Sequence, residues 1–195
     1  MSLSRRAFLG RTAAAGAAAT LPAGLIAAAP AQAQESDRSD ALERLVLLEQ
    51  AAELAYSLAA EDSDLEEEIA STFAELSSHC GMHATALSEV MDQLNAEPPD
   101  SSDDPADYES LKGYDSGDRA GAQLDFLDGL EVGLIEAYGD AVPALEAGDL
   151  ARTAAQIAAG HAQHLVALRL LADVPADEIT DLPAASTSAT ASTEP

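Results

Sequence analysis

The chain has 195 residues and a formal net charge of −26 at pH 7, with 35 acidic residues against nine basic ones. This length suits one domain with flanking segments. A chain this acidic lacks the basic surface that a nucleic acid requires, which argues against nucleic-acid binding. Cys80 is the only cysteine, so no disulfide can form within the chain and stability must come from a packed core.

The first 33 residues have the features of an export signal. Ser4–Leu9 (SRRAFL) looks like a twin-arginine export motif, and an Ala/Gly/Leu-rich stretch follows from Thr12 to Ala29. Ala31–Ala33 matches the small-x-small pattern of a cleavage site, so we expect the mature chain to begin at Gln34. The protein is then extracytoplasmic, with no stable membrane span after signal removal. The alternative is an alanine-rich membrane anchor, which the prolines and weak hydrophobicity of this stretch disfavour.

The acidic residues all lie after the predicted signal. Residues 34–195 carry a net charge of −29, and Lys112 is the only lysine. Such a surface repels itself in dilute buffer and is tolerated in high salt, where the Debye length falls to about 3 Å at 1 M. The charge therefore indicates a halophilic host that exports most of its proteins folded. The same export route also suits a protein that is loaded with a metal before it leaves the cytoplasm.

Four helices are predicted because apolar residues recur at alternating steps of three and four. This spacing is the seam of an antiparallel bundle. Short turns are expected after the first and third helices, so that the chain forms two helical hairpins. The predicted helices span about 39–60, 64–95, 116–141 and 150–172, within a domain of residues 39–173.

An acidic, proline-containing stretch at 96–115 separates the two predicted hairpins. It is too long for a tight turn and too polar for a strand, so it is expected to be a long crossover loop. After the last helix, residues 184–195 are rich in Ser, Thr and Ala and are predicted to be disordered. The sequence therefore predicts an all-α fold in which a crossover joins two hairpins.

The two halves of the predicted bundle repeat each other. Leu48-Glu49…Ala55-Tyr56 recurs 82 residues later as Leu130-Glu131…Ala137-Tyr138. A second block that starts at His83 recurs 81 residues later, starting at His164. This near-constant offset indicates a duplicated pair of helices.

The repeated polar residues occupy seam positions where an ordinary bundle would have leucine. Glu49 and Glu131 are each flanked at three and four residues by Leu or Ala, so both are predicted to be buried. A buried carboxylate needs a partner to stay ionised. The candidate partners are tyrosine hydroxyls, a metal ion, or the histidines, all four of which lie on the second and fourth helices: His79, His83, His161 and His164.

With these residues the chain resembles the ferritin-like superfamily over about Ser39 to Ala172. The resemblance implies an antiparallel ferritin-like four-helix bundle. In the di-iron members, the first and third helices each supply one glutamate, and the second and fourth each supply Glu-x-x-His. Glu49 and Glu131 match the single glutamates, and His83 and His164 match the two histidines.

The chain departs from that pattern at two positions. Cys80 and His161 stand where the di-iron members have the glutamates of Glu-x-x-His. Two carboxylates neutralise a di-iron pair less well than four, and the set is richer in nitrogen and softer. It suits one zinc, copper or iron ion better than an oxygen-bridged pair. The predicted metal ligands are Glu49, Cys80, His83, Glu131, His161 and His164.

Two interpretations of these polar residues stay open. In the first, the bundle binds Fe, Zn or Cu and handles iron or oxidants. In the second, the glutamates, histidines and tyrosines satisfy one another without a metal, and the protein is a non-catalytic scaffold or interaction module. Cys80 is then a small buried hydrophobe, the role that cysteine fills more often, and His79 is a flanking residue in either case. A monomer or a homodimer is expected.

Overall fold

The computed structural model describes residues 28–62, 65–115, 120–145, 148–175 and 178–179. These residues form four α-helices and two short 3-10 helices, with no strand among them. The helices are α1 (Ala28–Ala60), α2 (Glu67–Gln93), α3 (Ala120–Ala141) and α4 (Asp149–Leu171), and the 3-10 helices are η1 (Pro105–Asp107) and η2 (Glu109–Leu111). The predicted all-α four-helix bundle is confirmed.

The first helix is longer than the sequence pattern predicted. It begins at Ala28, although the apolar stripe predicted a start near Ser39. Residues 34–40 have no apolar stripe, and most of their side chains are exposed, so the periodicity could not indicate a helix there. Pro30 falls in the first turn, where its missing N–H costs no helical hydrogen bond.

The other helix ends lie within a few residues of the predictions. Helix α2 begins at Glu67 and ends at Gln93, followed by Asn95 in the left-handed conformation (φ 57°) that asparagine tolerates. Helix α3 ends at Ala141 as predicted. Much of the predicted signal (residues 1–27), the region where α3 was predicted to start (116–119) and the predicted disordered tail (184–195) lie outside the described residues.

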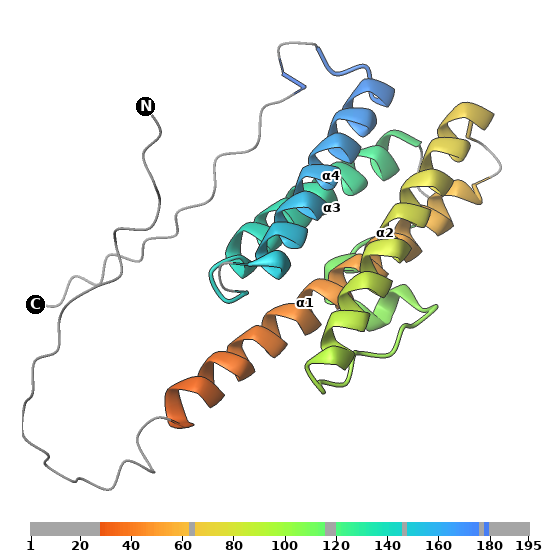
Figure 1. The fold of residues 1–195 in the computed structure, drawn as a ribbon. Coiled ribbons are helices and arrows are strands. Elements are labelled where there is room, and N and C mark those ends of the chain that lie inside the picture. The colour runs from red at the N-terminus through yellow and green to blue at the C-terminus, as the bar shows by residue number, and fades with distance from the viewer. Residues whose placement is uncertain (1–27, 63–64, 116–119, 146–147, 176–177, 180–195) are drawn as a thin grey trace, which may run out of the picture.

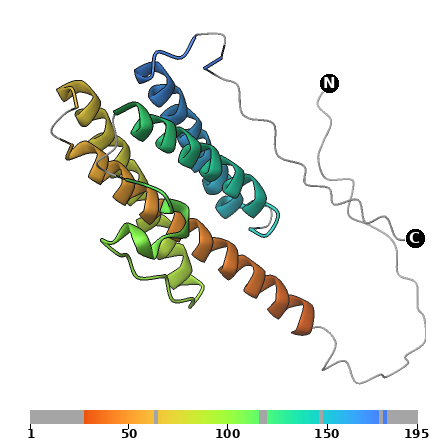
Figure 2. The same cartoon turned by 180° about the vertical axis from the view of Figure 1, so that it is seen from behind.

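The four helices form two hairpins that pack against each other. Helices α1 and α2 run antiparallel in one hairpin, and α3 and α4 do so in the other (Figure 1). Helices α1 and α3 contact each other between the hairpins, whereas α2 and α4 meet at only a few positions. The first part of α1 projects beyond the rest of the bundle, as the view from behind also shows (Figure 2).

The core lies along the facing stripes of the four helices, as the three-and-four spacing predicted. Its largest fully buried side chains include two tyrosines of the sequence repeat, Tyr56 and Tyr138, which are 0% exposed. Leucines are the commonest of the other fully buried side chains: Leu42, Leu45, Leu87, Leu127, Leu134 and Leu168. Burial of this apolar surface is the main driving force that holds the hairpins together.

The crossover between α2 and α3 packs on α1. Its two short helices bury Tyr108 and Leu111, which are 6% and 2% exposed. The side-chain amide of Gln50 on α1 donates to the Pro99 carbonyl at 3.2 Å, and the Tyr114 hydroxyl donates to the Ala55 carbonyl at 3.1 Å. The acidic loop is therefore held against α1.

None of the described helices combines the length and the apolar character that crossing a bilayer requires.

Candidate metal centre

Two glutamates lie at the middle of the bundle, one from each hairpin. Glu49 on α1 and Glu131 on α3 are both 0% exposed. Burial by itself would raise the pKa of each carboxyl group. Hydrogen bonds and charge from neighbouring histidines outweigh it, so the pKa of Glu49 falls to about 2 and that of Glu131 is also lowered. Both side chains are therefore carboxylates inside the core.

Each of the two repeat tyrosines donates a hydrogen bond to the glutamate of the other hairpin. The Tyr56 hydroxyl on α1 donates to Glu131 Oε1 at 2.6 Å, and the Tyr138 hydroxyl on α3 donates to Glu49 Oε1 at 2.5 Å. Burial and the nearby carboxylates raise the pKa of both hydroxyls, so each remains a donor. The duplication in the sequence thus becomes a reciprocal pair of contacts between α1 and α3.

His161 on α4 lies between the two glutamates. Its Nδ1 is 2.8 Å from Glu131 Oε2, and its Nε2 is 2.9 Å from Glu49 Oε1. A carboxylate only accepts hydrogen bonds, so both contacts are hydrogen bonds only when both ring nitrogens carry a proton. Burial lowers the pKa of this imidazole, but the bonds to Glu131 and Glu49 outweigh burial and raise it to about 9. Without a metal, His161 is therefore an imidazolium held by two carboxylates.

His164 continues this network towards the surface. Its Nδ1 is 3.2 Å from Glu131 Oε1, and its Nε2 is 3.2 Å from Nδ1 of His79. The rings of His79 and His164 stack with their centroids 5.3 Å apart. His79 is only partly buried, so it forms the edge of the cluster between α2 and α4.

His83 faces the other glutamate without a hydrogen bond. Its Nδ1 lies 3.4 Å from Glu49 Oε2, within ion-pair distance. Both atoms are buried, and neither makes a hydrogen bond with the described residues. Buried polar atoms are nearly always paired, so these two facing atoms are candidates for binding a further group.

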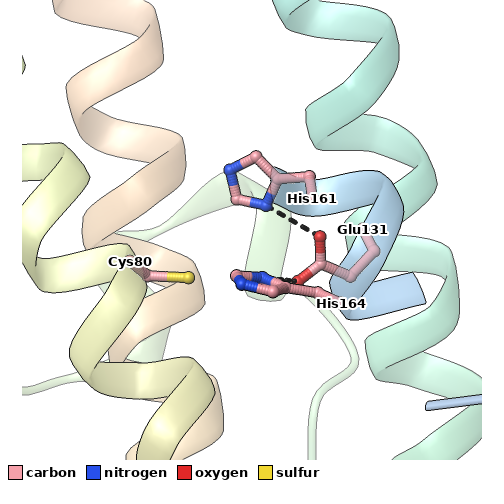
Figure 3. Close-up of side chains that lie close together, drawn as sticks. All are labelled: Cys80, Glu131, His161 and His164. Carbon is pink, nitrogen blue, oxygen red and sulfur yellow. Dashed lines mark hydrogen bonds and ion pairs between the residues drawn. The ribbon is translucent and has the colours of Figure 1, made fainter. Parts of the chain in front are cut away.

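Cys80 approaches the cluster from α2. Figure 3 shows its thiol pointing towards His161 and His164 on α4, with Glu131 on their far side. The residue is 0% exposed, and burial followed by the charges of Glu49 and Glu131 raises the pKa of the thiol. In the metal-free protein it is a neutral, buried thiol, which is compatible with a small buried hydrophobe and with a potential metal ligand.

The structure brings all six predicted ligands together, in two groups. In each group, one ligand atom from every member lies within 4.8 Å of those of the others. One group is Glu49, His83 and His161, and the other is Cys80, Glu131, His161 and His164. The sequence predicts these residues only as one set, because the spacing along a helix does not say which partner each side chain faces.

His79 is the residue of the cluster that sequence reasoning placed outside it. The apolar pattern predicts a flanking position for it, because it lies just off the stripe of the second helix. It precedes His83 by four residues, which puts both imidazoles on one face of α2. That spacing was the signal that could have shown His79 next to the site.

The fold and this cluster define the chain as a four-helix bundle protein whose helices each direct polar side chains into a shared core. A family model described as a ferritin-like domain matches residues 36–173. The match covers more than half of the chain, so the chain belongs to the ferritin-like domain family. No curated protein and no solved structure matches it significantly.

The residues present fit a transition metal, but not the four-carboxylate set of a di-iron centre. Two carboxylates, three imidazoles and a thiol are ligand types that zinc, copper and iron accept in proteins. The Glu49 and His83 atoms without hydrogen bonds are both potential ligand atoms, and they lie in the same group. The site thus fits a bound metal ion by its chemistry and by its unsatisfied atoms.

Proposed function

We propose that this protein binds a transition metal, Zn, Cu or Fe, in its buried core and handles iron or oxidants outside the cytoplasm. The observation that carries the proposal is the facing pair of Glu49 Oε2 and His83 Nδ1, buried without hydrogen bonds beside four further potential ligands. A metal there would satisfy both atoms and would compensate the buried negative charge. A bound redox metal would supply electron transfer, and zinc would supply Lewis acidity.

Metal uptake by the purified protein tests this proposal. Metal-free protein is incubated anaerobically with Fe(II), Zn(II) or Cu(I), desalted, and analysed for bound metal. We expect at least one ion per chain, and a strong reduction in the His83→Gln and Glu49→Gln variants, which each remove one ligand. Glu75→Gln is the matched control, because Glu75 is exposed on α2 outside the cluster. No stoichiometric uptake of any of the three ions would overturn the proposal.

One observation favours a second function, that of a scaffold without a metal. Both nitrogens of His161 and both oxygens of Glu131 already have hydrogen-bond partners within the protein. Such a network can stabilise a core and fix its packing without an ion. The double variant Cys80→Glu, His161→Glu recreates both Glu-x-x-His motifs. If the wild type binds nothing and this variant takes up iron, the chain is a bundle that has lost its metal.

We also propose that the chain leaves the cytoplasm by the twin-arginine route. The support is the SRRAFL segment, the Ala/Gly/Leu-rich stretch and the small-x-small site in the sequence. Arg5→Lys together with Arg6→Lys tests this. We expect the variant to accumulate inside the cells, whereas the wild-type chain appears outside the cytoplasm in a shortened form. Equal export of both proteins would contradict the proposal.

A further inference from the structure

We propose that the cluster binds two divalent ions in unlike positions, with the His161 ring shared between them, one nitrogen for each. The inference rests on the proposed function that the core binds metal, and it specifies how. It follows from the separation of the ligands into two groups that have only His161 in common.

The first position is formed by Glu49, His83 and the Nε2 side of His161. Glu49 Oε1 lies 2.9 Å from this nitrogen, and Glu49 Oε2 lies 3.4 Å from His83 Nδ1. The carboxylate therefore reaches both imidazoles with different oxygens. The position offers one oxygen-bearing and two nitrogen-bearing ligands, one fewer than a closed tetrahedral site. The His83 side chain is 22% exposed, so this position lies nearer the surface than the second one.

The second position is formed by Cys80, Glu131, His164 and the Nδ1 side of His161. All four residues are buried, with exposed fractions of 0–5%. Glu131 Oε2 is 2.8 Å from His161 Nδ1, and its Oε1 is 3.2 Å from His164 Nδ1. One sulfur, one carboxylate and two imidazoles make a complete four-ligand set of the kind that zinc prefers. This position is therefore a closed one.

His161 is the residue that makes two ions compatible. The two nitrogens of an imidazole point away from each other, and here each is directed at a different glutamate. When two ions bind, the two ring protons and the Cys80 thiol proton leave to solvent, so that an imidazolate and a thiolate remain. No electrons are transferred in this step.

The charge of the site balances with two divalent ions. The carboxylates of Glu49 and Glu131, the thiolate of Cys80 and the imidazolate of His161 supply four negative charges, which match two M²⁺ ions. Two carboxylates alone do not neutralise the charge of two metal ions, and for this reason the sequence favours a single ion. A buried site must be close to neutral to be stable, and Cys80 and His161 provide the charge that the missing glutamates do not.

Cobalt(II) titration of the metal-free protein tests the inference. Anaerobic Co(II) serves as a coloured probe: a thiolate-to-cobalt charge-transfer band in the near ultraviolet reports the second position. Bound cobalt after desalting reports the sum of both positions. We expect two Co(II) per chain and the charge-transfer band in the wild type. Cys80→Ser should lose the band.

Two variants separate the positions. His83→Gln should bind one Co(II) per chain and keep the band. It should fold normally, because the His83 side chain is 22% exposed and its Nδ1 makes no hydrogen bond. His161→Gln should weaken cobalt binding at both positions, each by at least about tenfold. Circular dichroism checks that each variant is folded, and Glu75→Gln is again the control.

The outcomes distinguish this inference from the function on which it rests. No bound cobalt, zinc, copper or iron in the wild type would overturn the proposed function. One Co(II) per chain with the charge-transfer band would leave the function standing and overturn the two-ion inference. Two Co(II) per chain that persist unchanged in His83→Gln would show that the second ion lies elsewhere, which also overturns it.

Discussion

The hydroxyl of Tyr138 on α3 donates a hydrogen bond to the carboxylate of Glu49 on α1, 89 positions earlier in the chain. Its counterpart in the sequence repeat, Tyr56, donates in the opposite direction, from α1 to Glu131 on α3. Each hairpin therefore satisfies the buried acid of the other. This exchange connects the duplication in the sequence to the assembly of the two hairpins, and it holds the two carboxylates beside His161.

The tyrosine exchange predicts energetic coupling between residues of opposite hairpins. In metal-free protein, Tyr56→Phe and Glu131→Gln should couple by about 2 kcal/mol in a double-mutant cycle, because the bond joins a hydroxyl to a buried carboxylate. Urea unfolding measures the free energies of the four proteins. The control cycle pairs Tyr56→Phe with Glu49→Gln, which lie on one helix and share no hydrogen bond. Equal coupling in the two cycles would argue against the exchange.

The stability of the metal-free protein should depend on the protonation of the Glu49–His161–Glu131 network. The folded protein raises the pKa of His161 from 6.5 to about 9, so this stabilisation is complete below pH 6.5 and is lost as the pH rises through about 9. The pKa of Glu49 is lowered from 4.5 to about 2, so its contribution is present above pH 4.5 and is lost as the pH falls through about 2. We expect maximal stability between pH 4.5 and 6.5, by chemical unfolding in a chelating buffer.

His161→Gln is the variant that isolates the alkaline side of this profile. It should flatten the loss between pH 6.5 and 9, which amounts to at most about 3 kcal/mol in the wild type. Above that range, burial of Cys80 and of the two tyrosines adds a further loss in both proteins, because their raised pKa values disfavour the folded state once the unfolded chain ionises. An unchanged profile in the variant would show that His161 is not the titrating group.

The acidic composition predicts a dependence on salt. With 35 acidic and nine basic residues, the folded chain repels itself, and salt screens this repulsion. We expect the thermal midpoint to rise steadily from low salt to molar KCl. Replacing two exposed acids of α2 outside its first turn, Glu75 and Glu89, with glutamine should raise the midpoint in low salt and reduce its salt dependence. A midpoint that is independent of salt would contradict the halophilic interpretation.

An ion pair between Arg169 on α4 and Asp128 on α3 should stabilise this hairpin at the end away from its turn. The Arg169 guanidinium binds Asp128 through two hydrogen bonds of 2.7 and 3.2 Å and donates to the Ile179 carbonyl at 2.9 Å. Arg169→Met should lower the free energy of unfolding by about 1–3 kcal/mol, because Asp128 is 30% exposed and part of the loss is met by water. Arg169→Lys keeps the charge but not the paired geometry. Its free energy of unfolding in urea should lie between those of the wild type and of Arg169→Met.

Much of the fold could be predicted because its determinants repeat with a helical period. The alternation of three and four residues located the buried stripes, and the recurrence of Glu49 as Glu131 marked the centre of both hairpins. The beginning of α1 could not be predicted, because its exposed residues carry no apolar stripe. Nor could burial of Tyr108 and Leu111 be predicted, since single apolar residues in an acidic loop do not indicate which helix they cover.

The sequence predicts which residues form the candidate site, but not how their side chains face one another. The sequence pattern placed Glu49, His83, Glu131 and His164 towards a shared centre. It could not show that His161 uses both ring nitrogens, because this depends on how α4 is rotated against α1 and α3. The position of His79 could not be predicted for a related reason. It lies just off the apolar stripe, and only the packing of α2 beside α4 brings its ring against His164.

The most direct test of the central claim is an anomalous-scattering map from crystals of the native protein, recorded at the absorption edges of zinc, copper and iron. We predict anomalous density within bonding distance of Glu49 and His83, with a second peak beside Cys80 and His164. Well-ordered side chains without anomalous density at any of these edges, even after the crystals are soaked with the metals, would contradict it and would leave the tyrosine–glutamate–histidine network as a metal-free core.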